Sequence, residues 1–188
     1  MKKNLLFTQI TNRILKMRFL LLLMLFPFSL AAQKQNTDVS PKGFMGPLAI
    51  DWSFFGTTKQ HDMQELGLKY NVTYEVIRGL KVAAHFENSV VLKYKDDTKR
   101  YFNSNALAGG IGYAFASDNR GGTWEARGFV GHSVGNVDWK NMFYSAEVVW
   151  KMRGGLSPML SLGFTHKNSN TSGIPNMNMM HASLGIAF

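Results

Sequence analysis

The segment 66–77, "LGLKYNVTYEVI", alternates between two kinds of side chain at every second residue. One set is apolar and comprises Leu66, Leu68, Tyr70, Val72, Tyr74 and Val76. The other is small or polar and comprises Gly67, Lys69, Asn71, Thr73 and Glu75. Successive side chains of a β-strand point to opposite faces, so this period predicts a strand with one apolar and one polar face. The same period, and not the 3.6-residue period of an amphipathic helix, dominates the sequence after residue 33.

Eight segments with this alternation are predicted as strands, near residues 46–56, 64–77, 80–93, 105–117, 122–133, 141–152, 157–166 and 177–188. The connections after the second, fourth and sixth segments are short and rich in turn formers: "RG", "SDNRGG" and "RGGLS". The other four are mostly longer and more polar: "TTKQHDMQE", "KYKDDTKRYFNSN", "HSVGNVDWKN" and "KNSNTSGIPN". Short turns at one end and long loops at the other predict an all-β, eight-stranded antiparallel up-and-down transmembrane β-barrel.

A soluble exported barrel also alternates, but its apolar face points inward. Two further features favour the membrane barrel. The second face of the fourth segment consists of small residues, which suit the narrow interior of an eight-stranded barrel: Ala106, Ala108, Gly110, Gly112, Ala114 and Ala116. Aromatic residues lie near strand ends on the apolar face, as they do at membrane interfaces: Trp52, Tyr70, Tyr113, Trp124, Tyr144, Trp150 and Phe188. A soluble periplasmic binding barrel remains the alternative.

Residues 1–32 have the pattern of a secretory signal peptide, in which basic residues precede a short apolar block and small residues. The basic residues are Lys2, Lys3, Arg13, Lys16 and Arg18, and the block is "FLLLLMLFPF", followed by "SLAA". This block is too short for a membrane-spanning helix, which needs roughly 20 apolar residues. We therefore predict a cleaved signal peptide over 1–32, a short polar leader over 33–43 and a barrel over 44–188. Met17 is an alternative start, because the sequence from that residue is a complete signal by itself.

Composition excludes several classes of function. The chain has 21 basic and 12 acidic residues, but five basic and no acidic residues lie in the predicted signal peptide, which leaves 16 and 12, a net charge of +4. Such a charge gives little support for nucleic-acid binding. The absence of cysteine excludes disulfides and thiolate metal sites. The histidines show no close pairing, so we expect no metal and no cofactor: His61, His85, His132, His166 and His181.

The last segment, "NMMHASLGIAF", carries apolar side chains at alternate positions up to a final phenylalanine: Met180, Ala182, Leu184, Ile186 and Phe188. This pattern resembles the small OmpA/OmpX-type outer-membrane barrels, over essentially all of the mature chain. In that family the machinery that inserts barrels reads a closing strand of this kind. The resemblance implies that these five residues form a barrel-assembly signal. It also implies a monomer in the outer membrane of a Gram-negative-type bacterium, with membrane lipid, lipopolysaccharide and the insertion machinery as partners.

Side chains at every second strand position share a face, and on the face opposite the apolar one this places charges of both signs inside the barrel. They are Asp51, Lys69, Glu75, Lys81, Glu87, Glu125, Arg127, Glu147 and Lys151. One interpretation is an ion path or a gate in a narrow porin-like channel. The other is a network of ion pairs that fills the interior, because buried charges must be paired and acids and bases are nearly equal here. We favour the network, which resembles what fills the interior of OmpA/OmpX-type barrels.

The connection after the third segment gathers Lys93, Lys95, Lys99 and Arg100 beside two aspartates. On an outer surface these bases would meet the phosphates of lipopolysaccharide through salt-sensitive electrostatic contacts. The alternative is a solvated loop of mixed charge.

The segment "GFTHKNSNTSGIPN" resembles part of the lipid A deacylase barrels, in which a histidine and a serine followed by asparagine form the active site. The resemblance implies His166 as general base, Ser169 as nucleophile and Asn170 as its neighbour. A serine nucleophile needs such a base, and a further acid to orient the base. Two features depart from that family: the histidine and serine are three residues apart instead of two, and no Asp or Glu follows Glu147. The alternative is a polar loop of turn formers.

The sequence therefore favours a non-catalytic outer-membrane barrel with a structural, surface-interaction or lipopolysaccharide-contact role. The alternatives are a lipid A deacylase-like hydrolase, a narrow channel and a soluble periplasmic binding barrel.

Overall fold

The computed structural model describes residues 48–95, 98–118, 121–152 and 156–188, although the side chains of residues 95 and 98–100 are not described. All of these ranges belong to one compact unit, Val39–Phe188. The predicted signal peptide (1–32) and leader (33–43) lie outside the described residues. Among the described residues no helix is long and apolar enough to cross a membrane.

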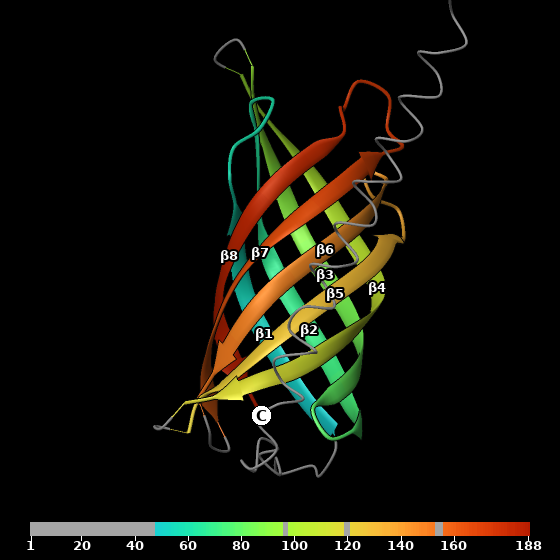
Figure 1. Cartoon of the computed structure of the whole chain (residues 1–188). Helices are drawn as coiled ribbons and strands as arrows, with labels where there is room; N and C mark the ends of the chain where they lie inside the picture. Colours follow the sequence, from blue (N-terminus) through green and yellow to red (C-terminus); the bar gives the residue numbers. More distant parts are fainter. Residues whose placement is uncertain (1–47, 96–97, 119–120, 153–155) are drawn as a thin grey trace, which may run out of the picture. The chain divides into compact units, whose positions relative to one another are not determined.

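The described residues form eight antiparallel strands that close into one barrel (Figure 1). The strands are β1 (Leu48–Thr57), β2 (Met63–Ile77), β3 (Leu80–Lys95), β4 (Thr98–Ser117), β5 (Thr123–Ser133), β6 (Asn141–Lys151), β7 (Ser157–Ser169) and β8 (Met177–Ala187). Each strand pairs with its neighbours in sequence, and β8 pairs back with β1 from Asp51↔Ala187 to Thr57↔His181. The predicted eight-stranded antiparallel β-barrel is therefore confirmed.

The two ends of the barrel differ in their connections (Figure 1). We call the end with the β1–β2, β3–β4, β5–β6 and β7–β8 connections the loop end, and the opposite end, where Phe188 lies, the turn end. At the turn end, β2 and β3 are joined by the two-residue turn Arg78–Gly79. Gly79 has a φ of +79° there, a conformation that glycine adopts without steric cost.

The strands at the loop end are longer than predicted. The stretch "KYKDDTKRYFNSN" was expected to be a long loop, and this expectation is wrong over most of its length. β3 continues to Lys95 and β4 begins at Thr98, with the ladder running through Lys93↔Arg100 to Asn88↔Asn105. β7 likewise continues past residue 166 to Ser169. Strand pairing uses backbone hydrogen bonds, so it persists where the side chains have lost the apolar alternation that identified the strands.

The barrel wall separates a polar interior from an apolar exterior. On β2, Lys69, Asn71 and Thr73 are buried, whereas Tyr70 and Val72 on the other face are 43% and 42% exposed. Small residues of β4 line the interior as far as Ala114, and Ala106 and Ala108 pack there. The space they leave is filled by Phe129 and Phe143, which come from β5 and β6 and are almost fully buried. The strand register shifts between Ala114 and Ala116, so that Ala116 pairs with the outward-facing Trp124 and leaves the predicted interior face.

Candidate functional site

The interior of the turn end holds a cluster of ion pairs centred on Arg127 of β5. Its guanidinium lies 2.7 Å from Asp51 of β1 (Nη2 to Oδ2) and 2.7 Å from Glu125 (Nε to Oε1). Two lysines complete the cluster: Lys81 Nζ lies 2.6 Å from Glu125 Oε2, and Lys151 Nζ lies 2.9 Å from Asp51 Oδ2. Each of the two carboxylates therefore binds Arg127 and at least one lysine.

Glu147 of β6 is the centre of a second group, halfway along the barrel. Its Oε2 lies 3.5 Å from Lys69 Nζ and 3.2 Å from His181 Nε2, and it accepts a hydrogen bond from Ser161 at 3.3 Å. Its Oε1 lies 3.7 Å from Arg127 Nη1, which connects this group to the first.

A third group lies towards the loop end, where Lys167 of β7 binds two carboxylates. Its Nζ donates to Glu65 Oε1 and to Glu87 Oε1, both at 2.7 Å. His85 Nε2 lies 3.7 Å from Glu87 Oε2, and its Nδ1 bonds to Asn71 Oδ1 at 2.7 Å. Asn71 in turn donates to Asp51 at 2.6 Å. Polar contacts thus run without a break from Glu65 near the loop end to Lys81 near the turn end.

The charges predicted from parity lie in or beside this network. Asp51, Lys69, Glu87, Glu125, Arg127 and Glu147 are buried, and Glu75, Lys81 and Lys151 are half-buried. Glu75 also accepts a hydrogen bond from the backbone N–H of Gly79 at 2.7 Å, so it holds the β2–β3 turn.

The sequence reasoning missed four interior members: Glu65, His85, Lys167 and His181. Lys167 lies beyond the predicted end of its strand, and Glu65 lies at the predicted edge of a loop. Lys167 is two residues from Thr165 and Glu65 is four residues from Lys69, so the alternation of each strand would have placed both on the inward face.

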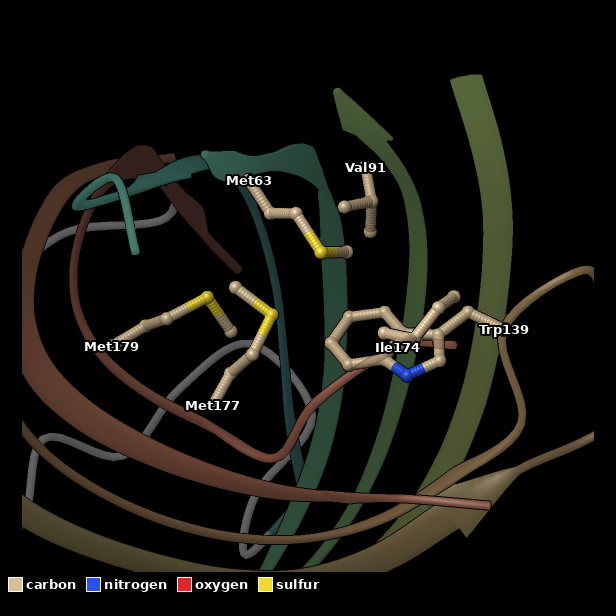
Figure 2. Packing of buried hydrophobic residues seen from close by; sticks show 6 residues of the cluster. All are labelled: Met63, Val91, Trp139, Ile174, Met177 and Met179. Atoms are coloured by element: carbon tan, nitrogen blue, oxygen red, sulfur yellow. The ribbon is translucent and has the colours of Figure 1, made fainter. Parts of the chain in front are cut away.

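An apolar cluster fills the interior at the loop end (Figure 2). It comprises Met63, Val91, Trp139, Ile174, Met177 and Met179, with Phe102 packed against it. Five of the six members are 0% exposed, and Ile174 is 8% exposed. Trp139 and Ile174 come from the β5–β6 and β7–β8 connections, so two connections turn inward over the charged interior. This cluster is not predictable from the alternation of the sequence, because its members lie near strand ends and in expected loops.

His166 and Ser169 lie on opposite faces of β7 and bind different partners. His166 stacks near Tyr144 on the outer face and bonds to Asn168 and Asn178. The hydroxyl of Ser169 accepts a hydrogen bond from Trp139 Nε1 at 3.1 Å and contacts the backbone of Thr171. The structure does not bring the predicted nucleophile and base together, and Asn170 follows in the β7–β8 connection.

The basic residues of the connection after the third predicted segment belong to the β3–β4 hairpin. Lys93 pairs with Arg100, and Tyr94 pairs with Lys99. Lys93 is half-buried, while the side chains of Lys95, Lys99 and Arg100 lie outside the described part. A contact with lipopolysaccharide stays a prediction.

The alternate apolar residues of the last strand all point away from the interior. Met180 and Leu184 are each 65% exposed, and Phe188 is 38% exposed. The Phe188 N–H donates to the carbonyl of Ile50 on β1 at 2.9 Å, so the seam between β8 and β1 extends to this residue. The predicted interface aromatics, Trp52, Tyr70, Tyr113, Trp124, Tyr144 and Trp150, also lie on outward positions of their strands.

No protein-family model matches this chain, and a search of curated proteins finds no match. Within the described ranges, no group of three or more His, Cys, Asp or Glu side chains could hold a metal ion.

Proposed function

We propose that the chain is a non-catalytic integral β-barrel of the outer membrane, with a structural or surface-interaction role. Its interior would act as a rigid filling of ion pairs, and its outer face as the surface that contacts lipid. Export through a cleaved signal peptide and insertion by the barrel-assembly machinery belong to the same proposal.

The observation that supports it is the polarity of the two faces. Large apolar side chains are exposed on the outer face of every strand, for example Phe54, Val72, Phe86, Ile111, Val130, Val148, Leu162 and Leu184. A contiguous apolar surface of this extent is rare on a soluble monomer, and a soluble barrel would carry it inside. An apolar band outside a polar interior is what a bilayer requires of a closed barrel.

The interior argues against a catalytic or open-channel role. The charges are paired across the barrel, which leaves the carboxylates bound to cationic groups instead of available to a substrate. The only predicted nucleophile–base pair, Ser169 and His166, is divided between two faces of β7.

Quenching of tryptophan fluorescence by lipids brominated in their acyl chains tests insertion directly. Trp52 and Trp124 are 39% and 40% exposed on the outer face, whereas Trp139 is 0% exposed in the interior. Three variants would each keep one of these tryptophans, with the other three replaced by phenylalanine.

In vesicles we expect strong quenching of Trp52 and Trp124 and little quenching of Trp139, which serves as the internal control. Equal quenching of all three, or protein that stays in the supernatant with no quenching, would contradict insertion. The second result would support the soluble barrel. Fractionation of cells then tests the location, since an integral barrel stays with the outer membrane after an alkaline wash.

Lipopolysaccharide contact is tested by comparing vesicles with and without lipopolysaccharide. The chain with Lys93, Lys95, Lys99 and Arg100 all changed to Gln is the variant, and the chain with Lys59 and Lys140 changed to Gln is the control from the same end of the barrel. We expect weaker, less salt-dependent association for the first variant only. Equal behaviour of both would indicate a solvated hairpin of mixed charge.

A further inference from the structure

We propose that the apolar cluster at the loop end is a binding site for one soft monovalent cation, Cu(I) or Ag(I), with the thioether sulfurs of Met63, Met177 and Met179 as ligands. The proposal does not depend on the function proposed above, because it concerns the interior of the barrel and not the surroundings of its outer face.

The three methionines enter one space from two strands. Met177 and Met179 are two residues apart on β8 and share its inward face, and Met63 is the first inward residue of β2. All three are 0% exposed and belong to one packed cluster. Figure 2 shows their side chains pointing toward one another inside the barrel wall.

The end of β1 creates the room for them. β2 and β8 are the two neighbours of β1. Thr57, the last residue of β1, pairs with His181 of β8, and its hydroxyl oxygen accepts a hydrogen bond from the backbone N–H of Glu65 on β2. Met179 and Met63 are each one inward position beyond those partners, towards the loop end. Flexible thioether side chains therefore occupy the space above the end of β1.

The groups below the sulfurs include two carboxyl groups that share one lysine. Met177 pairs with Lys167 across β7–β8, and Lys167 binds both Glu65 and Glu87. One ammonium group therefore serves two carboxyl groups. Glu65 Oε2 is buried and has no hydrogen-bond partner in the described part of the chain. An unpaired buried carboxyl oxygen is costly, and a cation bound nearby would favour the ionised form of this group.

The donor set selects the kind of cation. Thioether ligands are soft and favour Cu(I), whereas Ca²⁺ and Mg²⁺ require several oxygen ligands. The indole of Trp139 lies in the same cluster and offers a face that attracts cations, as shown by Lys167 Nζ at 5.3 Å from its ring centroid.

The test is titration of the full mature chain, refolded in detergent, with silver nitrate in chloride-free buffer. Ag(I) is used because, unlike Cu(I), it needs no reductant to keep it in the monovalent state. Native mass spectrometry gives the number of bound ions, and calorimetry gives the affinity. We expect one tightly bound Ag(I) per barrel. The variant with Met63, Met177 and Met179 all changed to leucine should bind at least about tenfold more weakly. Leucine conserves volume, so the apolar packing is retained.

The matched control changes Met142, Met159 and Met180 to leucine. Met142 and Met180 lie on the outer face, and Met159 is buried near the turn end, away from the cluster. This control should bind silver as the unchanged chain does. An absence of saturable binding, or equal loss in both triple variants, would overturn the proposal, the latter because it indicates adventitious binding to surface sulfur.

Two further measurements keep the test decisive if the triple variant folds poorly. Each single Met→Leu change should weaken binding, in protein whose gel mobility before heating shows a folded barrel. Glu65→Gln should also weaken Ag(I) binding, because it removes the negative charge that balances the cation. Unchanged affinity in Glu65→Gln and in all three single variants would contradict the assignment. X-ray absorption of the Cu(I) form should show sulfur neighbours that the triple variant lacks.

Discussion

Arg127 of β5 and Asp51 of β1 form an ion pair across the interior of the barrel, with Nη2 2.7 Å from Oδ2. The two strands lie four positions apart in the closed order of eight, so this single pair connects opposite walls. Both side chains are 0% exposed, and a second hydrogen bond joins Nη1 to Oδ1 at 3.3 Å. The bidentate geometry fixes the distance between the two walls.

Arg127→Ala should lower the free energy of unfolding by about 3–5 kcal/mol, because it leaves Asp51 and Glu125 buried without their main partner. Urea unfolding of the refolded barrel measures the loss. Lys59→Ala is the control, since the Lys59–Asp62 pair is 53% and 68% exposed and such pairs contribute no more than about 1 kcal/mol. Similar small losses in both variants would show that the interior pair is not structural.

We expect no steady conductance from the unchanged chain in planar bilayers, because ion pairs and the apolar cluster fill the interior. Arg127→Ala alone should remain closed, since the cluster around Trp139 still seals the loop end. The double change Arg127→Ala and Trp139→Ala should open a measurable path. A steady current through the unchanged chain that Glu125→Ala or Arg127→Ala alters would instead support the narrow channel.

Gly110→Ala and Gly109→Ala form a matched pair on β4. A Cβ on Gly110 would collide with the carbonyl oxygen of Gly128 and the ring of Phe129, whereas a Cβ on Gly109 would meet nothing within 4 Å. Gly110→Ala should therefore cost about 1–3 kcal/mol of unfolding free energy, and Gly109→Ala should be within about 0.5 kcal/mol of neutral. Thermal or urea unfolding distinguishes them, and equal effects would contradict the described packing.

Lipid A incubated with the refolded protein should keep all of its acyl chains, because Ser169 Oγ is bound to Trp139 and lies on the face of β7 opposite His166. Mass spectrometry of lipid A is the measurement, with His166→Ala as the comparison. Loss of one acyl mass with the unchanged chain, but not with His166→Ala, would make the protein a hydrolase. Ser169→Ala should instead cost about 1 kcal/mol of stability through the lost hydrogen bond.

Phe188→Ala should reduce the amount of barrel assembled in cells and leave the yield of refolding in detergent nearly unchanged. The predicted role of Phe188 is recognition by the insertion machinery, while its backbone bond to Ile50 does not need the ring. Heat-modifiable mobility on gels measures both quantities. Phe54→Ala, another outward phenylalanine, is the control. Equal losses in cells and in detergent would indicate a purely structural ring.

The sequence predicts the architecture well wherever one face is apolar and the other is not. The segment 66–77 illustrates this, since the alternation of Tyr70 with Lys69 specifies both a strand and its orientation in the wall. The prediction was poorest at the loop end, where polar residues occur on both faces. The backbone ladder of the β3–β4 hairpin continues there without any side-chain period to reveal it.

The sequence predicts which individual side chains face the interior, but it does not predict which of them form ion pairs with one another. Parity placed Arg127 and Asp51 on the inner face, yet their pairing depends on strands separated by 76 residues in sequence. The Met63, Met177 and Met179 grouping depends similarly on β2 and β8 lying on either side of β1. These contacts between distant parts of the sequence form only when the barrel closes, so no local sequence pattern predicts them.

The barrel can close only after its last strand is available, because β8 pairs with β1. Residues from Asp51 to Thr57 find their second neighbour only among residues from His181 to Ala187. A chain that still lacks β8 therefore has two unpaired strand edges, on β1 and on β7, and each edge can pair with another chain. We therefore expect a chain cut before β8 to aggregate through these edges and not to form a smaller stable barrel.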